Sequence, residues 1–446
     1  MKIYLIGIAG TAMGAFAGLL KQAGHEVVGS DAATYPPMKD KLSEWGIRVK
    51  TPYAASNIEA DSDLVVVGNI VSKDHIEVLE VLRLGLKTTS FPQALNSLFL
   101  SDKKSVVAAG THGKTTISAI LAHTLTHTGR DPSFLIGGIA QNFTESFHVG
   151  AGEPFVIEGD EYDTAFFDKG PKFLHYKPFY LLCSSLEYDH ADIYKSVDEI
   201  IERFAQLISL VPGDGVIVLN NLFPDLKRAL EKSELKAKLI EYGEPAMLVE
   251  SSKGLEFEVN AARVSIPLAG RHNAQNAFGC YLILQSMGLT HEEIQGGFSS
   301  FQGVKRRMEE VGLKNGILVI DDFAHHPTAV KTTLEGAKKR YPGRPLWALF
   351  EPRSASSCRK VFQNAYAASF DAADRVLLAP PGRHLEPGIM MDVPKLALDV
   401  GLKATACDSY DKMIELVRAE VPANAVLLCM SNGAFGGIHR KILEVL

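Results

Sequence analysis

The heptapeptide GTHGKTT, Gly110 to Thr116, stands between a short apolar run and a helical pattern. A glycine-rich turn in this position lets backbone N–H groups wrap a phosphate chain, and the following helix N-terminus favours anions. Lys114 would neutralise the β and γ phosphates, and the Thr115 hydroxyl would bind Mg²⁺. The strict pattern has a glycine five residues before Gly113, where this chain has Ala108. The heptapeptide therefore predicts the phosphate loop of a variant family, at the end of a strand in an α/β sheet. The predicted phosphate contacts in the loop are Gly110, Thr111, His112, Gly113, Lys114, Thr115 and Thr116.

Short apolar runs and helical patterns alternate along the chain of 446 residues. This alternation is typical of parallel sheets that are covered by helices, the α/β class. It restarts after a polar connector at 101–104 and again near residue 317, which predicts three domains, 1–102, 103–312 and 313–446. Within them, 255–264 is expected to be antiparallel strand and 359–370 to be a helix.

Charge and composition exclude several classes of protein. Lys plus Arg is 46 and Asp plus Glu is 52, so the formal charge is 46 − 52 = −6, and neither a nucleic-acid nor an anionic-membrane partner is expected. No apolar run is long enough for a membrane span, and glycines at 7, 10 and 14 interrupt the first apolar stretch, which argues against a secretion signal. The five scattered cysteines predict buried thiols in a reducing compartment, so we expect a cytoplasmic protein.

Two acidic clusters follow apolar strands of the middle domain. EGDEYD begins at Glu158, and LEYDHAD contains His190. Carboxylates at the carboxyl ends of strands, in the same domain as a phosphate loop, are typical metal ligands of nucleotide enzymes. The first cluster therefore predicts metal ligands beside the phosphate loop, and His190 with its neighbouring acids could complete a second magnesium site.

The N-terminal sequence GIAGTAM resembles a dinucleotide fingerprint with altered spacing. Gly7 and Gly10 are three residues apart, where the fingerprint has two. Such a loop can still hold a diphosphate, with Asp31 at a strand end available for a ribose or base. Used as a dinucleotide site, it would instead indicate a nicotinamide oxidoreductase.

Two further motifs are expected at binding positions. GRHNAQN, Gly270 to Asn276, places amides and an imidazole at a helix start, which suits a nucleotide base or phosphate. DDFAHHPT, Asp321 to Thr328, follows the first strand of the third domain, where open sheets bind ligands.

In their order along the chain these motifs, together with FQGVKRRME at 301–309, resemble those of the Mur ligases, ATP-dependent amide-forming enzymes of bacterial peptidoglycan synthesis. The resemblance covers essentially the whole chain. It implies a Rossmann-like N-terminal domain for a UDP-sugar, a central ATPase domain with a phosphate loop and a mixed sheet, and a Rossmann-like C-terminal domain for the amine. It also implies that ATP binds the loop from Gly110 to Thr116, that Thr115, Glu158 and His190 hold Mg²⁺, and that Lys114, Glu158 and His190 are catalytic residues. We expect a monomer or weak homo-oligomer.

Two branches of that family share these motifs. One adds L-alanine to UDP-N-acetylmuramate, and the other adds the murein tripeptide L-alanyl-γ-D-glutamyl-meso-diaminopimelate. YPPM at 35–38, EPRS at 351–354 and MSNGAFGGIH at 430–439 resemble the second branch, and the L-alanine ligase is the alternative. A regulatory protein that hydrolyses ATP without a UDP-sugar is a further alternative.

The resemblance extends to individual positions. It implies further ATP contacts at His272, Asn273, Asn276, Arg307 (with Arg306 as the other candidate for a domain-closing basic residue) and Asp322. It implies UDP-sugar contacts at Gly7, Gly10, Thr11, Met13, Gly14, Asp31 and Asn69. It implies peptide contacts at His325, His326, Arg353, Ser431 and Asn432. Oligomeric state, tolerance of other peptide lengths, the choice between diaminopimelate and lysine, and the extent of domain closure stay open.

Overall fold

The computed structural model describes residues 1–386 and 388–446. These residues form two compact units. The first consists of Met1–Leu186, Asp198–Tyr242 and Gly279–Gly297, and the second of Glu187–Val197, Gly243–Phe278 and Phe298–Leu446.

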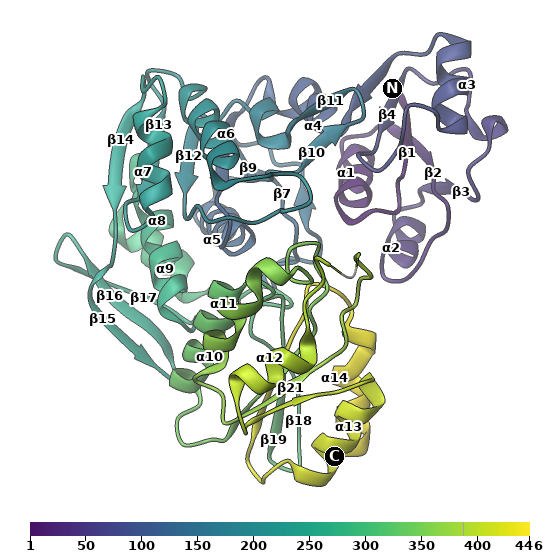
Figure 1. Cartoon of the computed structure of the whole chain (residues 1–446). Coiled ribbons are helices and arrows are strands. Elements are labelled where there is room, and N and C mark those ends of the chain that lie inside the picture. The colour runs from purple at the N-terminus through teal and green to yellow at the C-terminus, as the bar shows by residue number, and fades with distance from the viewer. Residues whose placement is uncertain (387) are drawn as a thin grey trace. The chain divides into compact units, whose positions relative to one another are not determined.

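The first unit begins with a five-stranded parallel sheet of order β3-β2-β1-β4-β5 (Figure 1). Its apolar strands are buried on both faces, as the continuous runs of Val, Ile and Leu require. The strands are β1 (Lys2–Ile6), β2 (Glu26–Ser30), β3 (Arg48–Lys50), β4 (Leu64–Val67) and β5 (Thr88–Ser90), and the main connecting helices are α1 (Thr11–Gln22), α2 (Met38–Glu44) and α3 (Ile76–Leu84). This is the doubly wound arrangement expected for the N-terminal domain.

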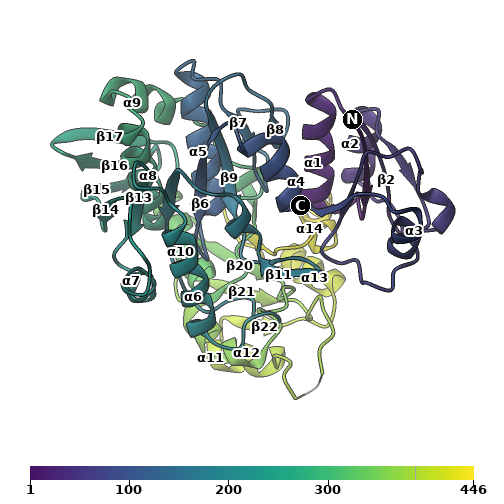
Figure 2. The same cartoon turned by 90° about the horizontal axis from the view of Figure 1, so that it is seen from above.

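The first unit also contains a seven-stranded sheet of order β14-β13-β12-β6-β9-β7-β8. Its strands are β6 (Lys104–Ala109), β7 (Ser133–Leu135), β8 (Phe147–His148), β9 (Pro154–Gly159), β12 (Tyr180–Cys183), β13 (Val216–Asn220) and β14 (Lys238–Tyr242). Only the pairing of β7 with β8 is antiparallel among the pairs described here, which confirms the mixed sheet. Helix α5 (Lys114–His127) packs on β6 and β9 (Figure 2). The helices α6 (Val197–Ser209) and α7 (Pro224–Glu231) precede and follow β13 along the chain. A hairpin of β10 (Asp163–Ala165) and β11 (Asp168–Pro171) follows β9.

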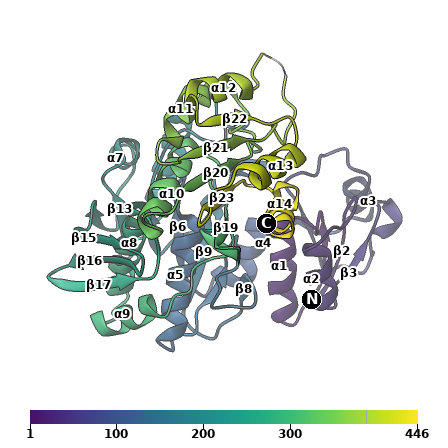
Figure 3. The same ribbon diagram turned by 90° about the horizontal axis from the view of Figure 1, so that it is seen from below.

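The second unit is built on a six-stranded sheet of order β18-β19-β23-β20-β21-β22 (Figure 3). Its strands are β18 (Glu309–Lys314), β19 (Ile317–Asp322), β20 (Leu346–Phe350), β21 (Arg375–Leu378), β22 (Ala404–Ala406) and β23 (Val426–Met430). All pairs are parallel except β18 with β19. The helices are α10 (Pro327–Arg340), α11 (Gln363–Ala367), α12 (Val393–Val400), α13 (Tyr410–Glu420) and α14 (Ile438–Val445), and each face of the sheet carries its own apolar core.

Two sequence expectations differ in detail from the structure. The antiparallel segment 255–264 is two strands of a three-stranded sheet, β15 (Ala246–Ser251), β16 (Gly254–Val259) and β17 (Ala262–Ile266), because Asn260 and Ala261 turn the chain with φ of 52° and 65°. The helix expected at 359–370 is divided into a 3₁₀ turn, α11 and a second 3₁₀ turn. Strand β18 begins at Glu309 and crosses the expected boundary at 312, so the exact domain limits stay predictions.

Helices α8 (Arg271–Ser286) and α9 (His291–Ser299) follow the three-stranded sheet along the chain. All five cysteines are buried and free, which confirms the expectation of unpaired thiols. Among the helices that the structure describes, none is long and apolar enough to cross a membrane.

Candidate active site

The phosphate loop connects β6 to α5 in a conformation that only glycine adopts without strain. Gly110 has φ of 145° and Gly113 has φ of 85°. A Cβ at Gly110 would lie 2.2 Å from Ser184 Oγ. Gly113 is the N-cap of α5 and offers no side-chain acceptor to the first N–H groups of the helix. These N–H groups are therefore available to an anion.

Two serines that the sequence analysis did not single out hold the loop in place. Ser185 lies after β12, the neighbour of β6, and its Oγ accepts a hydrogen bond from the His112 N–H at 2.9 Å. Ser184 Oγ donates to the His112 carbonyl at 2.6 Å. Their position just beyond an apolar strand could have indicated a role in binding. Their contact with the loop could not be predicted, because it depends on the pairing of that strand with β6.

Lys114 lies inside an acidic cluster. Its Nζ is 2.7 Å and 3.0 Å from the two carboxylate oxygens of Glu161, and it donates to the Gly110 carbonyl at 2.6 Å. Burial disfavours its charge, but the carboxylates of Glu161 and Asp160 outweigh burial and raise the pKa of Lys114. The lysine is therefore a fixed cation at the loop.

Glu158 and Thr115 are brought together, as the sequence predicted. Thr115 Oγ1 donates to Glu158 at 3.1 Å, and the Gly137 N–H donates to the other carboxylate oxygen at 2.6 Å. A hydroxyl and a carboxylate are hard oxygen donors that fit Mg²⁺. A Cβ at Gly137 would lie 3.1 Å from Glu158 Oε1, so a glycine here allows the backbone to approach the carboxylate this closely. His190 belongs to the second unit, and its place in the metal site stays a prediction.

The N-terminal loop is organised by Asp31. One carboxylate oxygen accepts the Ala9 N–H at 2.8 Å, while the other accepts the Ala32 N–H at 2.8 Å and the Tyr53 hydroxyl at 3.3 Å. Asp31 thus fixes the turn that begins at Gly7, which has φ of 85°. Contact of Asp31 with a ribose or base is untested.

The remaining positions of this predicted UDP-sugar site differ in exposure. Gly10 is the exposed N-cap of α1, and Thr11 and Asn69 are exposed as well. Met13 is 7% exposed and belongs to the core. Gly14 packs against Met38, which a Cβ there would approach to 2.2 Å. Met13 and Gly14 therefore shape the loop from within, and their contact with a ligand stays a prediction.

In the second unit, Asp189 lies beside three histidines. Burial raises the pKa of its carboxyl group, but His190, His325 and His326 outweigh burial and hold that pKa well below its usual range. The carboxylate accepts the His190 N–H at 2.7 Å, where His190 has φ of 53°. The sequence indicated a role for His190 and its neighbouring acids together, and nothing in it distinguished Asp189 from the other acids.

The two adjacent histidines of the HHP motif make different contacts. His326 caps α10, and its Nδ1 accepts the Thr328 N–H at 3.3 Å. Glu187 lies 3.8 Å from the same Nδ1 and accepts the Thr328 hydroxyl at 3.1 Å. The His325 ring packs edge-on against Phe323, 5.4 Å away. Peptide binding by either histidine stays a prediction.

The predicted nucleotide amides of α8 contact each other. Asn276 Nδ2 donates to Asn273 Oδ1 at 3.2 Å, and Asn273 Nδ2 donates to the Ala269 carbonyl at 2.8 Å. The His272 ring lies over Gly270, where a Cβ would approach it to 2.6 Å. The three side chains are thus grouped at one helix start, and their contact with ATP is untested.

Arg306 and Arg307 both stack on Phe323, with guanidinium carbons 5.2 Å and 4.9 Å from the ring centre. Arg306 also donates to Asp321 at 3.2 Å and to the Ser431 carbonyl at 2.8 Å, so it ties β19 to the loop after β23. Asp322 is buried, which raises its pKa although Arg307 opposes the shift. The ligand contact that the resemblance implies for Arg307, with Arg306 as the other candidate, stays a prediction.

Arg353 lies beyond the end of β20, near the loop after β23. Its Nη1 is 3.4 Å from Glu351 Oε1, and Ser431 Oγ donates to the same carboxylate. Asn432 Oδ1 is a buried oxygen without a hydrogen-bond partner among the described residues. The structure therefore brings Arg353, Ser431 and Asn432 to one edge of the sheet, because β20 and β23 are parallel neighbours.

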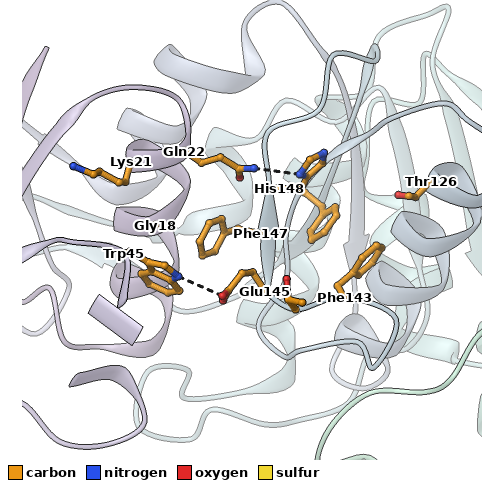
Figure 4. A pocket seen from close by; sticks show the side chains of 11 residues that line it. Gly18, Lys21, Gln22, Trp45, Thr126, Phe143, Glu145, Phe147 and His148 are labelled. Carbon is orange, nitrogen blue, oxygen red and sulfur yellow. Dashed lines mark hydrogen bonds between the residues drawn. The ribbon is translucent and has the colours of Figure 1, made fainter. Parts of the chain in front are cut away.

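A separate cavity of about 470 Å³ lies in the first unit (Figure 4). Phe147 packs on α1 at Gly18, where a Cβ would lie 2.3 Å from the ring, and Trp45 meets Phe147 edge-on at 5.0 Å. Lys41 and Trp45 both donate to Glu145, at 2.9 Å and 3.3 Å. The cavity is bordered by the last turns of α1 and α5, whereas the two predicted ligand loops precede these helices. It therefore belongs to neither loop.

Comparisons with known proteins cover the whole chain. Family models described as "Mur ligase family, catalytic domain", "Mur ligase middle domain" and "Mur ligase, glutamate ligase domain" match residues 2–103, 108–284 and 306–433.

The chain is 36% identical to UDP-N-acetylmuramate–L-alanyl-γ-D-glutamyl-meso-2,6-diaminoheptandioate ligase from Escherichia coli, over 100% of this chain and 98% of that protein. It is 29% identical to UDP-N-acetylmuramate–L-alanine ligase from Clostridium acetobutylicum, over 97% of this chain and 95% of that protein. A crystal structure of a murein peptide ligase from Psychrobacter arcticus 273-4 superposes with a TM-score of 0.75 at 33% identity, covering 100% of this chain and 98% of that one.

Proposed function

This chain belongs to the Mur ligase family, and we propose that it joins the tripeptide L-alanyl-γ-D-glutamyl-meso-diaminopimelate to UDP-N-acetylmuramate with consumption of ATP. The observation that carries the choice of amine is the full-length match of 36% to a ligase of that name, against 29% and 31% for two L-alanine ligases. The alternative function is therefore the ligation of L-alanine to UDP-N-acetylmuramate.

The geometry of the first unit supports ATP as the phosphoryl donor. The free N–H groups at the start of α5 and the Lys114 cation suit a phosphate chain. Thr115 and Glu158 would hold Mg²⁺, which when bound neutralises phosphate charge. His190 is the third proposed ligand. His272, Asn273, Asn276, Arg307 and Asp322 are proposed to complete the ATP site.

The proposed reaction has two steps. The lactoyl carboxylate of UDP-N-acetylmuramate attacks the γ-phosphorus, so an O–P bond forms, the bond to ADP breaks and an acyl phosphate results. The tripeptide amine then attacks the acyl carbon, a C–N bond forms, inorganic phosphate leaves and the amine loses a proton. Lys114 stabilises the charge on the transferring group, because it is held within reach of the loop before any phosphate binds.

The substrates are assigned to separate regions. UDP-N-acetylmuramate is proposed to bind the loop from Gly7 to Gly14, where Asp31 already fixes the backbone. The tripeptide is proposed to bind near Arg353, Ser431 and Asn432, with His325 and His326. A cytoplasmic location, a monomer or weak homo-oligomer and the three domain limits also belong to the proposal.

The test is an ADP-release assay with UDP-N-acetylmuramate and a panel of amines. We expect release that requires both the nucleotide sugar and an amine, with a much higher kcat/KM for the tripeptide than for L-alanine. Efficient use of L-alanine without any response to the tripeptide would establish the alternative. ADP release without a UDP-sugar would instead favour the regulatory ATPase.

A further inference from the structure

Glu351 is a fully buried carboxylate in the second unit, directly after β20, with 0% of its surface exposed. Its Oε1 accepts a hydrogen bond from the Tyr410 hydroxyl, and its Oε2 accepts one from Ser431 Oγ. Arg353 Nη1 is 3.4 Å from Oε1. A buried charge is tolerated only when it is paired and hydrogen-bonded, and these three groups provide both.

Tyr410 is itself fixed. It is the first residue of α13, its ring meets Phe435 edge-on at 5.5 Å, and Gly436 leaves room for the ring face. Burial, together with the hydrogen bond to Glu351, raises the pKa of Tyr410 to about 12. The phenol therefore stays protonated near neutral pH and remains a donor to the carboxylate.

Two glycines leave the space that the Arg353 side chain fills. A Cβ at Gly433 would lie 2.2 Å from both Cδ and Nε of Arg353. A Cβ at Gly382 would lie 2.8 Å from Glu351 Oε1 and 3.0 Å from Arg353 Cγ. A larger residue at Gly433 would displace the arginine, and one at Gly382 would press first on Glu351 and then on the arginine.

The arginine is nevertheless accessible. Its side chain is 44% exposed, although the carboxylate that contacts it is fully buried. A guanidinium has five N–H donors in one plane, and the contact with Glu351 involves Nη1. The exposed part of the plane is suited to a carboxylate, which it binds with two parallel hydrogen bonds.

We propose that Glu351 and Tyr410 are positioning residues that hold Arg353 in the orientation in which it selects an amine substrate carrying a distal carboxylate. Hydrogen bonds from Tyr410 and Ser431 hold the two Glu351 oxygens in place. The fixed carboxylate then orients the Arg353 guanidinium through Nη1 without enclosing it. This inference rests on the proposed function, because it takes the incoming peptide as the ligand of Arg353.

The experiment compares Glu351→Gln, Tyr410→Phe, Arg353→Ala and the double variant Glu351→Gln/Arg353→Ala in steady-state assays with the tripeptide. Glu415→Gln, on the exposed face of α13, is the matched control. Glu351→Gln should raise the KM for the tripeptide roughly tenfold and Tyr410→Phe roughly threefold, with kcat and the KM for ATP within about twofold of the parent. Adding Glu351→Gln to Arg353→Ala should raise that KM no further, because a positioning residue acts only through the residue it positions.

Each other outcome overturns the inference. Additive effects in the double variant would show that Glu351 acts independently of Arg353. A uniform loss of kcat with all substrates would show a structural role, and the milder Tyr410→Phe decides the matter if Glu351→Gln does not fold. A normal KM in Arg353→Ala would remove the premise about the arginine, while ligation of the tripeptide by the parent protein would still stand. If the parent does not use the tripeptide, the proposed function itself fails.

Discussion

Each of the two units holds one basic side chain against a buried glutamate, and the two pairs differ in how they use the cation. Lys114 contacts both oxygens of Glu161, and its side chain is 16% exposed. Arg353 touches one oxygen of Glu351 at 3.4 Å and is 44% exposed. The lysine charge is largely paired with Glu161, whereas much of the guanidinium remains exposed to solvent.

This difference matches two kinds of chemistry. A group that stabilises charge during a transfer benefits from a fixed position in a site with little water. A group that selects a substrate must remain accessible, and its planar donors give geometric selectivity. We therefore expect substitutions of Lys114 to affect every amine alike and substitutions of Arg353 to affect peptides selectively.

The largest effect is expected for Lys114→Ala. Turnover should fall by a factor of at least about 10² with any amine, because the lysine meets charge that grows during phosphoryl transfer. Phosphate release at saturating substrates measures it, and the circular-dichroism spectrum should show a retained fold. Lys104→Ala, at the other end of β6, is the control and should behave like the parent. Near-normal activity of Lys114→Ala would contradict the ATP assignment.

Arg353→Ala should have the next largest effect. We expect kcat/KM for the tripeptide to fall by the equivalent of roughly 2–4 kcal/mol, as when one partner of a charged hydrogen-bonded pair is removed. Any residual activity with L-alanine should be unaffected. Arg418→Ala, an exposed arginine of α13, is the matched control. An equal loss with both amines would erase the distinction between the two cations.

The metal site is expected to show a smaller effect. Glu158→Gln removes the charge but keeps the size, so the Mg²⁺ concentration for half-maximal activity should rise, by about tenfold. A magnesium titration measures this, and Glu153→Gln, just before the same strand, is the control. His190→Ala should shift the titration in the same direction. Activity that persists in excess chelator would disprove the metal assignment.

The two sites also differ in how far the sequence could predict them. The phosphate loop is contiguous, so Gly110 to Thr116 could be assigned from one heptapeptide, and the parallel sheets follow from the buried apolar strands. Ser184 and Ser185 could not be assigned, because their contact with His112 depends on the pairing of β12 with β6.

The cluster around Arg353 is assembled from segments that are far apart in the sequence. The pattern at 351–354 singled out the arginine, but the partner Tyr410 is 59 residues away from Glu351 and carried no signal of its own. The interrupted helix at 359–370 was missed for a related reason. Phe362, Tyr366 and Phe370 are spaced four residues apart, as on one face of a continuous helix, and all are buried in one core, so the apolar pattern carries no sign of the interruption.

The smallest effect is expected when a glycine is replaced. Alanine substitutions at Gly110, in the phosphate loop, and at Gly433, beside Arg353, allow the two sites to be compared directly. Gly110→Ala is strained in φ and would approach the Ser185 backbone to 2.9 Å, so we expect a loss of about 1–3 kcal/mol in unfolding free energy. Gly433 does not have positive φ, and the atoms that its Cβ would meet first belong to the flexible side chain of Arg353. Gly433→Ala should therefore lower the unfolding midpoint by no more than about 2 °C, yet raise the KM for the tripeptide roughly threefold by displacing the arginine. In the Arg353→Ala background, Gly433→Ala should have no further effect on that KM. Equal destabilisation by the two alanines would show that Gly433 is required by the backbone and not by the arginine.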